Sequence, residues 1–365
     1  MRRQRTSRGP AIAAVLCVAA AIGRAGAASA SDTAPIQVGT ARAVPGQTVR
    51  GTLAVGEAAD GTPVALPISI VSGTKAGPVV WVQAGAHGDE YGGPRALQEV
   101  VRGLDPGAMS GTVIAALIAN PPAFRGLQRV NPNLDDLADM GDAFPGRERF
   151  ATERIAAAVT AQVKRWAGFF VDLHTGGDRF RQHPFVFYTV TGKVPAGRYD
   201  AFARGFGLPT LWRDESRVFP NDAVTNFAAA GIPAFLVEVG GGQPLDSADL
   251  RLQANAVRRF LETAGVISGG AAPLPSYSVV TGYRIVTNAR GGFFEALVRP
   301  GDRVAEGAPL GRIFDPWGEV VETMTAPAGS RIVLGVSTYP AAPTGGWLFE
   351  VGTGLSESPA TTDRP

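Results

Sequence analysis

Two histidines and one glutamate stand at spacings that suit a catalytic metal site. His87 and Glu90 are three residues apart in the stretch AGAHGDE, so that the imidazole and the carboxylate can turn toward the same point. His174 lies in the stretch VDLHTGG, directly after an apolar run. Two imidazoles and one carboxylate are the protein ligands of many catalytic zinc ions, with a fourth position open for water. The pattern predicts one Zn²⁺ per chain, held by His87, Glu90 and His174.

A structural interpretation of these histidines competes with metal binding. A single buried histidine is more often a hydrogen-bonded structural residue than a ligand. His87 and His174, however, each follow a short apolar run and stand next to glycine-rich turns. Sheets of parallel strands hold their ligands at such strand ends. The coincidence of two such histidines favours a metal.

Glu238 and Arg129 are candidates for the remaining chemistry. Glu238 ends the apolar run AFLV, and a carboxylate that closes a buried strand is costly unless it is paired or used. A zinc hydrolase needs a group that takes a proton from water and passes it to the leaving atom, and Glu238 suits this role. The alternative is a salt-bridged structural glutamate. Arg129 is the candidate cation for a developing oxyanion, although its local sequence alone gives little support.

The segments around these residues predict an α/β domain. Short continuous apolar runs, expected of strands buried on both faces, alternate with stretches whose apolar residues recur at helical spacing. Such alternation predicts a mostly parallel sheet flanked by helices. The predicted strands are residues 78–82, 113–119, 169–173, 185–190 and 234–239, and the predicted helices are residues 94–101, 148–166, 196–206 and 246–264.

Six short motifs follow one another along the chain in a familiar order. They are His87-Gly88-Asp89-Glu90, Asn120-Pro121, Arg129, Phe144-Pro145-Gly146, Asp172-Leu173-His174 and Val237-Glu238-Val239-Gly240. Over residues 78 to 330 the chain resembles the succinylglutamate desuccinylase/aspartoacylase family, a branch of the zinc carboxypeptidase-like (M14) hydrolases. The resemblance implies a mixed, mostly parallel sheet, zinc on His87, Glu90 and His174, Glu238 as general acid/base and Arg129 as the group that polarises the carbonyl. It also implies hydrolysis of an amide bond in a small N-acyl amino acid.

One departure from the family pattern concerns the substrate. The family usually has Asp-Leu-Asn-Arg ahead of Phe-Pro-Gly, and the Asn-Arg pair grips a substrate carboxylate. Here Gly141 and Asp142 stand at those two positions, and they cannot form a bidentate clamp. We therefore expect either a neutral or cationic substrate end facing Asp142, or a substitute arginine such as Arg179 or Arg181. The predicted substrate-binding residues are Asp142, Asn120 and Arg181.

The N-terminal segment of the chain predicts export. Residues 1–30 combine a basic start, an apolar stretch and the small residues Ala28-Ser29-Ala30, which is typical of a cleaved signal peptide. We therefore expect a secreted or periplasmic protein. Without residues 1–30 the chain has 29 basic and 32 acidic residues and no cysteine, which excludes disulfides and argues against nucleic-acid binding. Apolar runs are too short for a membrane-spanning helix or stable anchor.

The domain organisation follows from composition. We expect a flexible leader over residues 31–45, the hydrolase domain over 46–267, a linker over 268–276, an all-β domain over 277–353 and a disordered tail over 354–365. The all-β domain resembles the biotinyl/lipoyl-like barrel found in part of the family. It lacks an acceptor lysine, since the chain's lysines are Lys75, Lys164 and Lys193. Its alternative roles are a cap over the active site and a contact in a homo-oligomer.

The sequence as a whole predicts an exported zinc-dependent deacylase or amidohydrolase that acts on a small acylated amino acid or a peptide. A carboxypeptidase-like peptidase that cleaves peptides or cell-wall fragments is the alternative among enzymes. A catalytically inactive binding protein of the same fold is the alternative outside them. Retention of all three ligand types together with Glu238 favours the enzyme, because a binding protein needs no general base.

Overall fold

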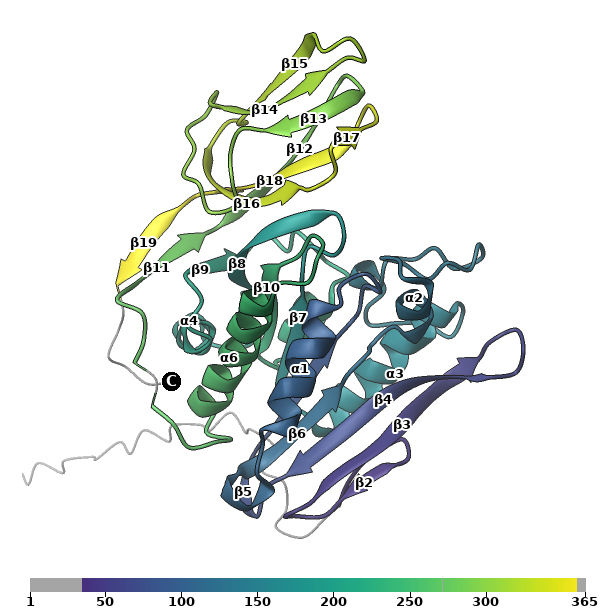
Figure 1. Ribbon diagram of the computed structural model, residues 1–365. Coiled ribbons are helices and arrows are strands. Elements are labelled where there is room, and N and C mark those ends of the chain that lie inside the picture. Colours follow the sequence, from purple (N-terminus) through teal and green to yellow (C-terminus); the bar gives the residue numbers. More distant parts are fainter. Residues whose placement is uncertain (1–34, 271, 360–365) are drawn as a thin grey trace, which may run out of the picture.

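The computed structural model of the chain describes residues 35–270 and 272–359. A sheet with helices on both faces forms the larger part, and a smaller part built of strands lies beyond one end of that sheet (Figure 1). The predicted fold class, a mixed α/β sheet with a C-terminal all-β region, is confirmed. No helix in the described ranges is both long and apolar enough to cross a membrane.

The apolar runs form the centre of the main sheet. Neighbouring strands are parallel in the order β10, β7, β5 and β6, and antiparallel strands β4 and β3 extend the sheet beyond β6. Strand β7 is buried along its whole length, as a continuous apolar run covered on both faces requires. These strands are β3 (Thr48–Glu57), β4 (Pro63–Ser72), β5 (Lys75–Ala84), β6 (Ser110–Ala116), β7 (Phe169–His174) and β10 (Ala234–Gly240).

Strand β8 (Phe180–Thr189) continues the sheet on the other side of β10. It is antiparallel to β10 and parallel to β9 (Thr210–Asp214), which in turn is parallel to β11 (Ser276–Val280). Strand β9 was not among the strands predicted from the sequence. Because β11 belongs to the segment that was assigned to the C-terminal domain, the two parts of the molecule are joined by strand pairing.

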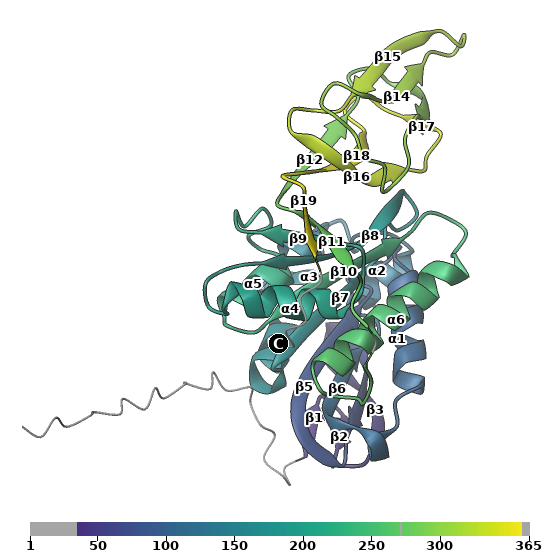
Figure 2. The same cartoon turned by 90° about the vertical axis from the view of Figure 1, so that its left-hand side faces the viewer.

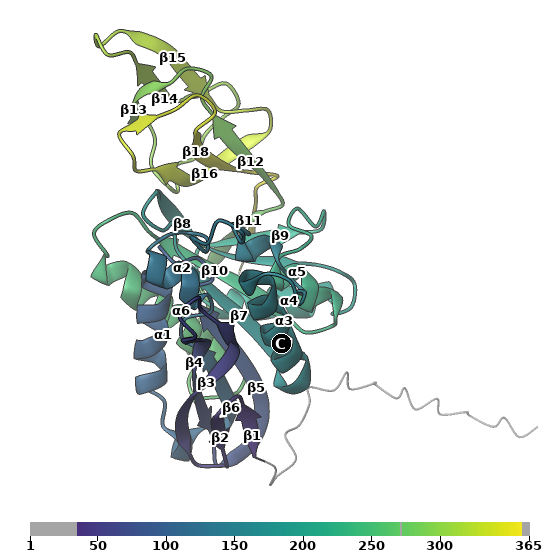
Figure 3. The same cartoon turned by 90° about the vertical axis from the view of Figure 1, so that its right-hand side faces the viewer.

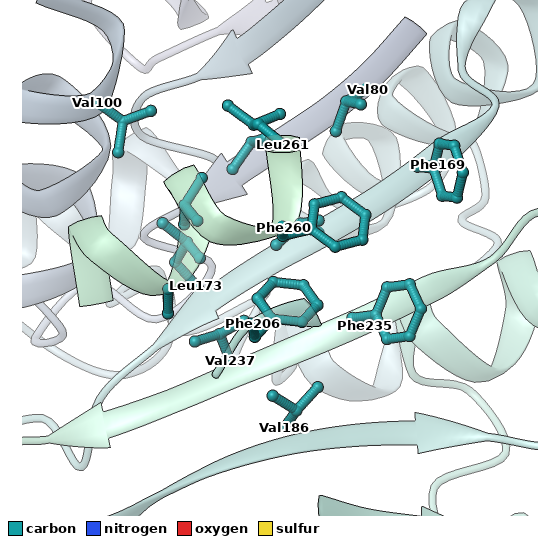
Figure 4. Packing of buried hydrophobic residues seen from close by; sticks show 14 of the residues in the cluster. Val80, Val100, Phe169, Leu173, Val186, Phe206, Phe235, Val237, Phe260 and Leu261 are labelled. Atoms are coloured by element: carbon teal, nitrogen blue, oxygen red, sulfur yellow. The ribbon is translucent and has the colours of Figure 1, made fainter. Parts of the chain in front are cut away.

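The helices divide between the two faces. Helices α1 (Gly92–Arg102), α4 (Ala196–Gly205) and α6 (Ser247–Thr263) pack on one face, where Phe206 and Phe260 stack beside Phe235 of β10 (Figure 4). Helices α3 (Ala151–Trp166) and α5 (Ala223–Ala229) cover the other face. The short helix α2 (Pro121–Gly126) lies beyond the strand ends. Each long helix places its apolar residues on the side toward the sheet.

The C-terminal part consists of strands in two layers (Figures 2 and 3). Three strands, β12, β18 and β16, extend the main sheet through a pairing of β16 with β8. The other layer has the order β15-β14-β13-β17, and a separate apolar core lies between the layers. The strands are β12 (Gly282–Thr287), β13 (Gly292–Ala296), β14 (Pro309–Phe314), β15 (Val320–Thr325), β16 (Ser330–Ser337), β17 (Ala341–Ala342) and β18 (Trp347–Thr353).

The structure corrects the prediction at both ends of the described chain. The segment predicted as a flexible leader forms β1 (Ile36–Val38) and β2 (Ala41–Ala43), whose alternate residues Val38 and Ala41 are buried. Within the predicted disordered tail, residues 354–365, Ser356–Pro359 form β19, which pairs with β11. Residues 360–365 lie outside the described residues. Both segments contain only short strands, and their order depends on contacts with neighbouring strands that composition does not indicate. The predicted signal peptide lies outside the described residues.

Candidate active site

The three predicted metal ligands come together. His87 lies in the loop after β5, Glu90 lies just ahead of α1, and His174 is the last residue of β7. The side chains are buried, and one ligand atom from each lies within 4.8 Å of the others. The Nδ1 atom of His87 is 2.6 Å from Glu90 Oε1, and the Nδ1 atom of His174 is 3.0 Å from Glu90 Oε2. We call His87, Glu90 and His174 the ligand cluster.

A close backbone contact fixes the loop that carries His87. A Cβ atom on Gly88 would lie 2.0 Å from the carbonyl carbon of Ala123, so only glycine fits there. Asn120 links the same two backbone segments. Its Nδ2 donates to the carbonyl oxygen of Ala86, and its Oδ1 accepts from the backbone N–H of Ala123 at the start of α2. Both polar ends of Asn120, which was predicted to bind substrate, thus contact the backbone.

Carboxylates stand behind both histidines. The Nε2 atom of His87 is 2.9 Å from Asp139 Oδ1, and the Nε2 atom of His174 is 3.5 Å from Asp172 Oδ1. Gln83 donates to the other oxygen of Asp172 at 2.7 Å. Neither aspartate was predicted from the sequence to have a role in the site. The spacing of Asp172 and His174 in a strand was a usable signal, because residues two apart point to the same face.

The donor set suits a zinc ion. The two Nδ1 atoms face Glu90 while the Nε2 atoms face carboxylates, which is how metal-binding histidines are commonly oriented. Burial opposes ionisation of Glu90, but the charges and hydrogen bonds of His87 and His174 outweigh it and hold its pKa well below its ordinary value. A carboxylate that stays ionised between two imidazole nitrogens is an appropriate ligand for a divalent cation.

Glu238 lies beside the ligand cluster with an unused oxygen. It pairs in register with His174 on the neighbouring parallel strand, so the two side chains share a face of the sheet. Its Oε1 atom is buried and has no hydrogen-bond partner among the described residues. Burial, reinforced by the charge of Glu90, raises the pKa of Glu238 well above its ordinary value. A buried carboxyl with a raised pKa is typical of catalytic sites.

Arg129 also points toward the cluster. Its side chain is about half exposed, its Nη1 is 3.5 Å from Glu90 Oε1, and its Nε donates to Asp139 Oδ2 at 2.9 Å. Asp139 therefore links Arg129 to His87. The arrangement brings one cation to the edge of the site, with other N–H groups of its guanidinium available for an anion.

The other predicted substrate residues occupy different surroundings. Gly141 lies next to His87, since a Cβ there would be 3.8 Å from His87 Nε2, whereas the side chain of Asp142 is exposed. Arg181 is engaged away from the cluster: its Nη2 donates to Asp249 at 3.1 Å, and its Nη1 donates to the carbonyl oxygen of Gly241. The third histidine, His183, lies within β8 and bonds to Thr210.

The pattern of the succinylglutamate desuccinylase/aspartoacylase catalytic domain matches residues 76–264, which is more than half of the chain. The chain belongs to the succinylglutamate desuccinylase/aspartoacylase family. It is thus an enzyme of a hydrolytic class, the deacylases. The matched residues contain the ligand cluster, Arg129 and Glu238, and they end with α6.

Similar proteins extend this family assignment beyond the catalytic domain. Over 288 residues the chain is 27% identical to an N-alpha-acetyl-L-2,4-diaminobutyric acid deacetylase of Halomonas elongata, covering 76% of this chain and 82% of that protein. The product-bound ectoine utilization protein EutE of Ruegeria pomeroyi superposes with a TM-score of 0.75 at 23% identity, covering 89% of this chain and 99% of that one. A family member from Rhodobacter sphaeroides superposes with a TM-score of 0.72 at 25% identity, covering 88% and 99%. These structures share the fold, the C-terminal part included.

Proposed function

We propose that the protein is a zinc-dependent deacylase that hydrolyses the amide bond of a small N-acyl amino acid. The observation that carries the proposal is the position of Glu238, a half-buried glutamate with a buried, unused oxygen beside two histidines and a glutamate. The similar protein from Halomonas elongata supports the substrate class, because its name states that it removes an acetyl group from an amino acid.

The residues divide the reaction between them. His87, Glu90 and His174 would hold the zinc ion, which when bound supplies a Lewis acid and lowers the pKa of a water molecule. Glu238 accepts the proton of the attacking water and returns it to the leaving nitrogen. Its burial suits this role, since a carboxyl with a raised pKa holds the proton between the two steps. Arg129 stabilises negative charge that develops on the acyl oxygen.

A substrate screen tests the proposal. N-acyl amino acids and short peptides are offered to the zinc-loaded wild type, to Glu238→Gln and to Glu148→Gln, whose exposed carboxylate is paired with Arg154. We expect Glu238→Gln to lower kcat for acyl amino acids by about 100-fold or more while zinc content stays at one per chain. Glu148→Gln should match the wild type.

Three results would contradict the proposal. Unchanged turnover in Glu238→Gln would remove the proton-transfer role. Release of C-terminal residues from peptides without turnover of acyl amino acids would favour the carboxypeptidase-like alternative. A protein that binds no zinc after refolding with zinc would favour a binding protein.

We also propose that the protein is exported. The support is the sequence of residues 1–30, with its basic start, apolar stretch and small residues before position 31. Expression of the full chain in a bacterial host, followed by fractionation and N-terminal sequencing, tests this. We expect a mature chain beginning at Ser31 outside the cytoplasm, and an uncleaved cytoplasmic chain would refute it.

A further inference from the structure

A row of register partners connects the catalytic strand with the C-terminal part. Gly240 of β10 pairs with Gln182 of β8, and Gln182 pairs with Gly335 of β16. Gly335 pairs with Glu350 of β18. The row thus leads from the end of the strand that carries Glu238 to a carboxylate of the C-terminal part.

Gln182 and Glu350 meet above Gly335. The Nε2 atom of Gln182 donates to Glu350 Oε2 at 3.1 Å. A Cβ atom on Gly335 would lie 2.5 Å from Gln182 Oε1 and 3.0 Å from Glu350 Oε2, so the missing side chain gives these two groups their space. Gln182 is 8% exposed and Glu350 is 7% exposed. We call them the Gln182–Glu350 pair.

The pair leaves one acceptor without a donor. Gln182 Oε1 is buried and has no hydrogen-bond partner among the described residues, as is true of Glu238 Oε1. The charges of Glu350 and Glu238 act on each other, which places both carboxylates in one electrostatic environment. Burial of polar acceptors is costly unless a donor reaches them. The carboxylate of Glu350 accepts hydrogen bonds from Gln182 and Tyr283 and is within reach of the charge of Arg129. The acceptor of the pair that lacks a donor is therefore the amide oxygen of Gln182.

The nearby arginines have other partners. Arg129 is paired with Asp139, Arg181 with Asp249 and Arg303 with Glu357. The family's carboxylate-gripping arginine is replaced by Asp142. In the described part of the chain, therefore, the surroundings of Glu350 are better suited to receive a cation than a second carboxylate.

We propose that the Gln182–Glu350 pair binds an ammonium group on the substrate side chain and so selects N-acyl amino acids with a positively charged side chain. An ammonium group has three N–H donors and no acceptor, which matches the carboxylate of Glu350 and the free oxygen of Gln182. The inference rests on the proposed deacylase function. On this inference the C-terminal part contributes to substrate specificity, in addition to any role as a cap over the active site.

Two matched pairs of compounds test the inference. Nα-acetyl-L-ornithine is compared with its uncharged isostere Nα-acetyl-L-norleucine, and Nα-acetyl-L-2,4-diaminobutyrate with Nα-acetyl-L-norvaline. We expect the wild type to prefer the charged member of at least one pair by about 10-fold or more in kcat/KM. Glu350→Gln should remove most of this preference, by lowering kcat/KM for the charged member more than for the uncharged member. Glu350→Asp should restore part of it.

Binding without turnover separates this inference from the proposed function. Calorimetry with the zinc-loaded Glu238→Gln variant measures the affinity of the four compounds, and the double variant with Glu350→Gln should lose the same preference. Glu295→Gln is the control, because it removes a glutamate of the C-terminal part that lies in the other sheet and faces Arg312. A binding preference for the charged compounds in this variant, together with no hydrolysis of any compound by the zinc-loaded wild type, would contradict the deacylase function and keep the ammonium site.

The inference is overturned by three outcomes. The first is a wild type that binds and cleaves charged and uncharged members equally. The second is a preference for Nα-acetyl-L-glutamate over all four compounds. The third is a Glu350→Gln variant in which both members of a pair are weakened alike. The last outcome would identify Glu350 as a structural residue at the junction of β16 and β18. A thermal melt of each variant establishes that it is folded before these comparisons are made.

Discussion

The ligand cluster and the Gln182–Glu350 pair differ in how the chain assembles them. The cluster comes from the ends of adjacent parallel strands, and two of its three residues lie within four positions of each other. The pair joins residues 168 positions apart, and it exists only because β16 and β18 continue the sheet beyond β8. The comparison teaches that the proposed zinc site forms within the catalytic domain, at the ends of adjacent strands, whereas the proposed selection of substrate depends on how the C-terminal part is attached.

The sharpest test of the proposed zinc site compares two histidines. His174→Ala removes a proposed zinc ligand, and His183→Ala removes a histidine that bonds to Thr210 outside the cluster. We expect the first variant to lose stoichiometric zinc and detectable hydrolysis, and the second to keep both, as measured by elemental analysis and initial rates. Equal zinc content in the two variants would place the metal elsewhere.

The next prediction concerns Asp172, whose carboxylate lies behind the proposed zinc ligand His174. Asp172→Asn keeps the shape but removes the negative charge 3.5 Å from His174 Nε2. Such second-layer changes typically lower metal affinity 10- to 100-fold, and competition with a zinc chelator measures the effect. Zinc affinity equal to that of the wild type would contradict the assigned orientation of His174.

The pH dependence of stability tests the environment of Glu350 in the Gln182–Glu350 pair. Burial raises the pKa of Glu350 to about 7, so between the unfolded pKa and about 7 the folded state keeps a proton that the unfolded chain has lost. The stability linked to this proton is present at low pH and is lost as the pH rises through about 7. Glu350→Gln should therefore be more stable than the wild type near pH 8, by about 1–3 kcal/mol, and the advantage should shrink near pH 5.

Urea denaturation of both proteins at the two pH values measures the difference, with Glu295→Gln as the reference for an exposed carboxylate. An advantage that does not change with pH would show that ionisation of Glu350 costs the folded protein nothing.

The smallest effect is expected at Asp142. The family's arginine position is occupied here by an exposed side chain, so Asp142→Ala should change kcat/KM for the acyl amino acids by less than about threefold. A larger loss confined to charged substrates would return Asp142 to the substrate site and would weaken the distinction between the two regions.

Much of the catalytic end could be predicted from the sequence, for a physical reason. Strands buried on both faces appear as continuous apolar runs, and polar residues at their ends, such as His174 and Glu238, must converge at one edge of a parallel sheet. The sequence also indicated His87 and Glu90 through their short spacing. Asp139 was missed because a 3₁₀ turn, which has no periodic signal, brings it to His87.

The remaining misses share another cause. Strand β1 pairs with the adjacent strand β2, and this hairpin packs against β3 and β4, whereas β19 pairs with the distant strand β11. Composition reveals neither the packing of the hairpin nor the pairing of β19. Glu350 looks like any glutamate in a strand, and only the register across β16 and β18 shows that it faces Gln182. Arg181 was a predicted substitute for the missing arginine, because the sequence does not show that its side chain pairs with Asp249.

Strand β8 has a consequence for how this enzyme can diversify. One of its edges is divided, with residues 180–182 bonded to β16 and residues 185–189 bonded to β9. A chimera in which a foreign sequence replaces everything after residue 267 would leave the edge of β8 unpaired unless the foreign strands matched this register. Unpaired strand edges promote aggregation. New specificities are therefore more accessible through point substitutions such as those at position 350 than through shuffling of whole modules.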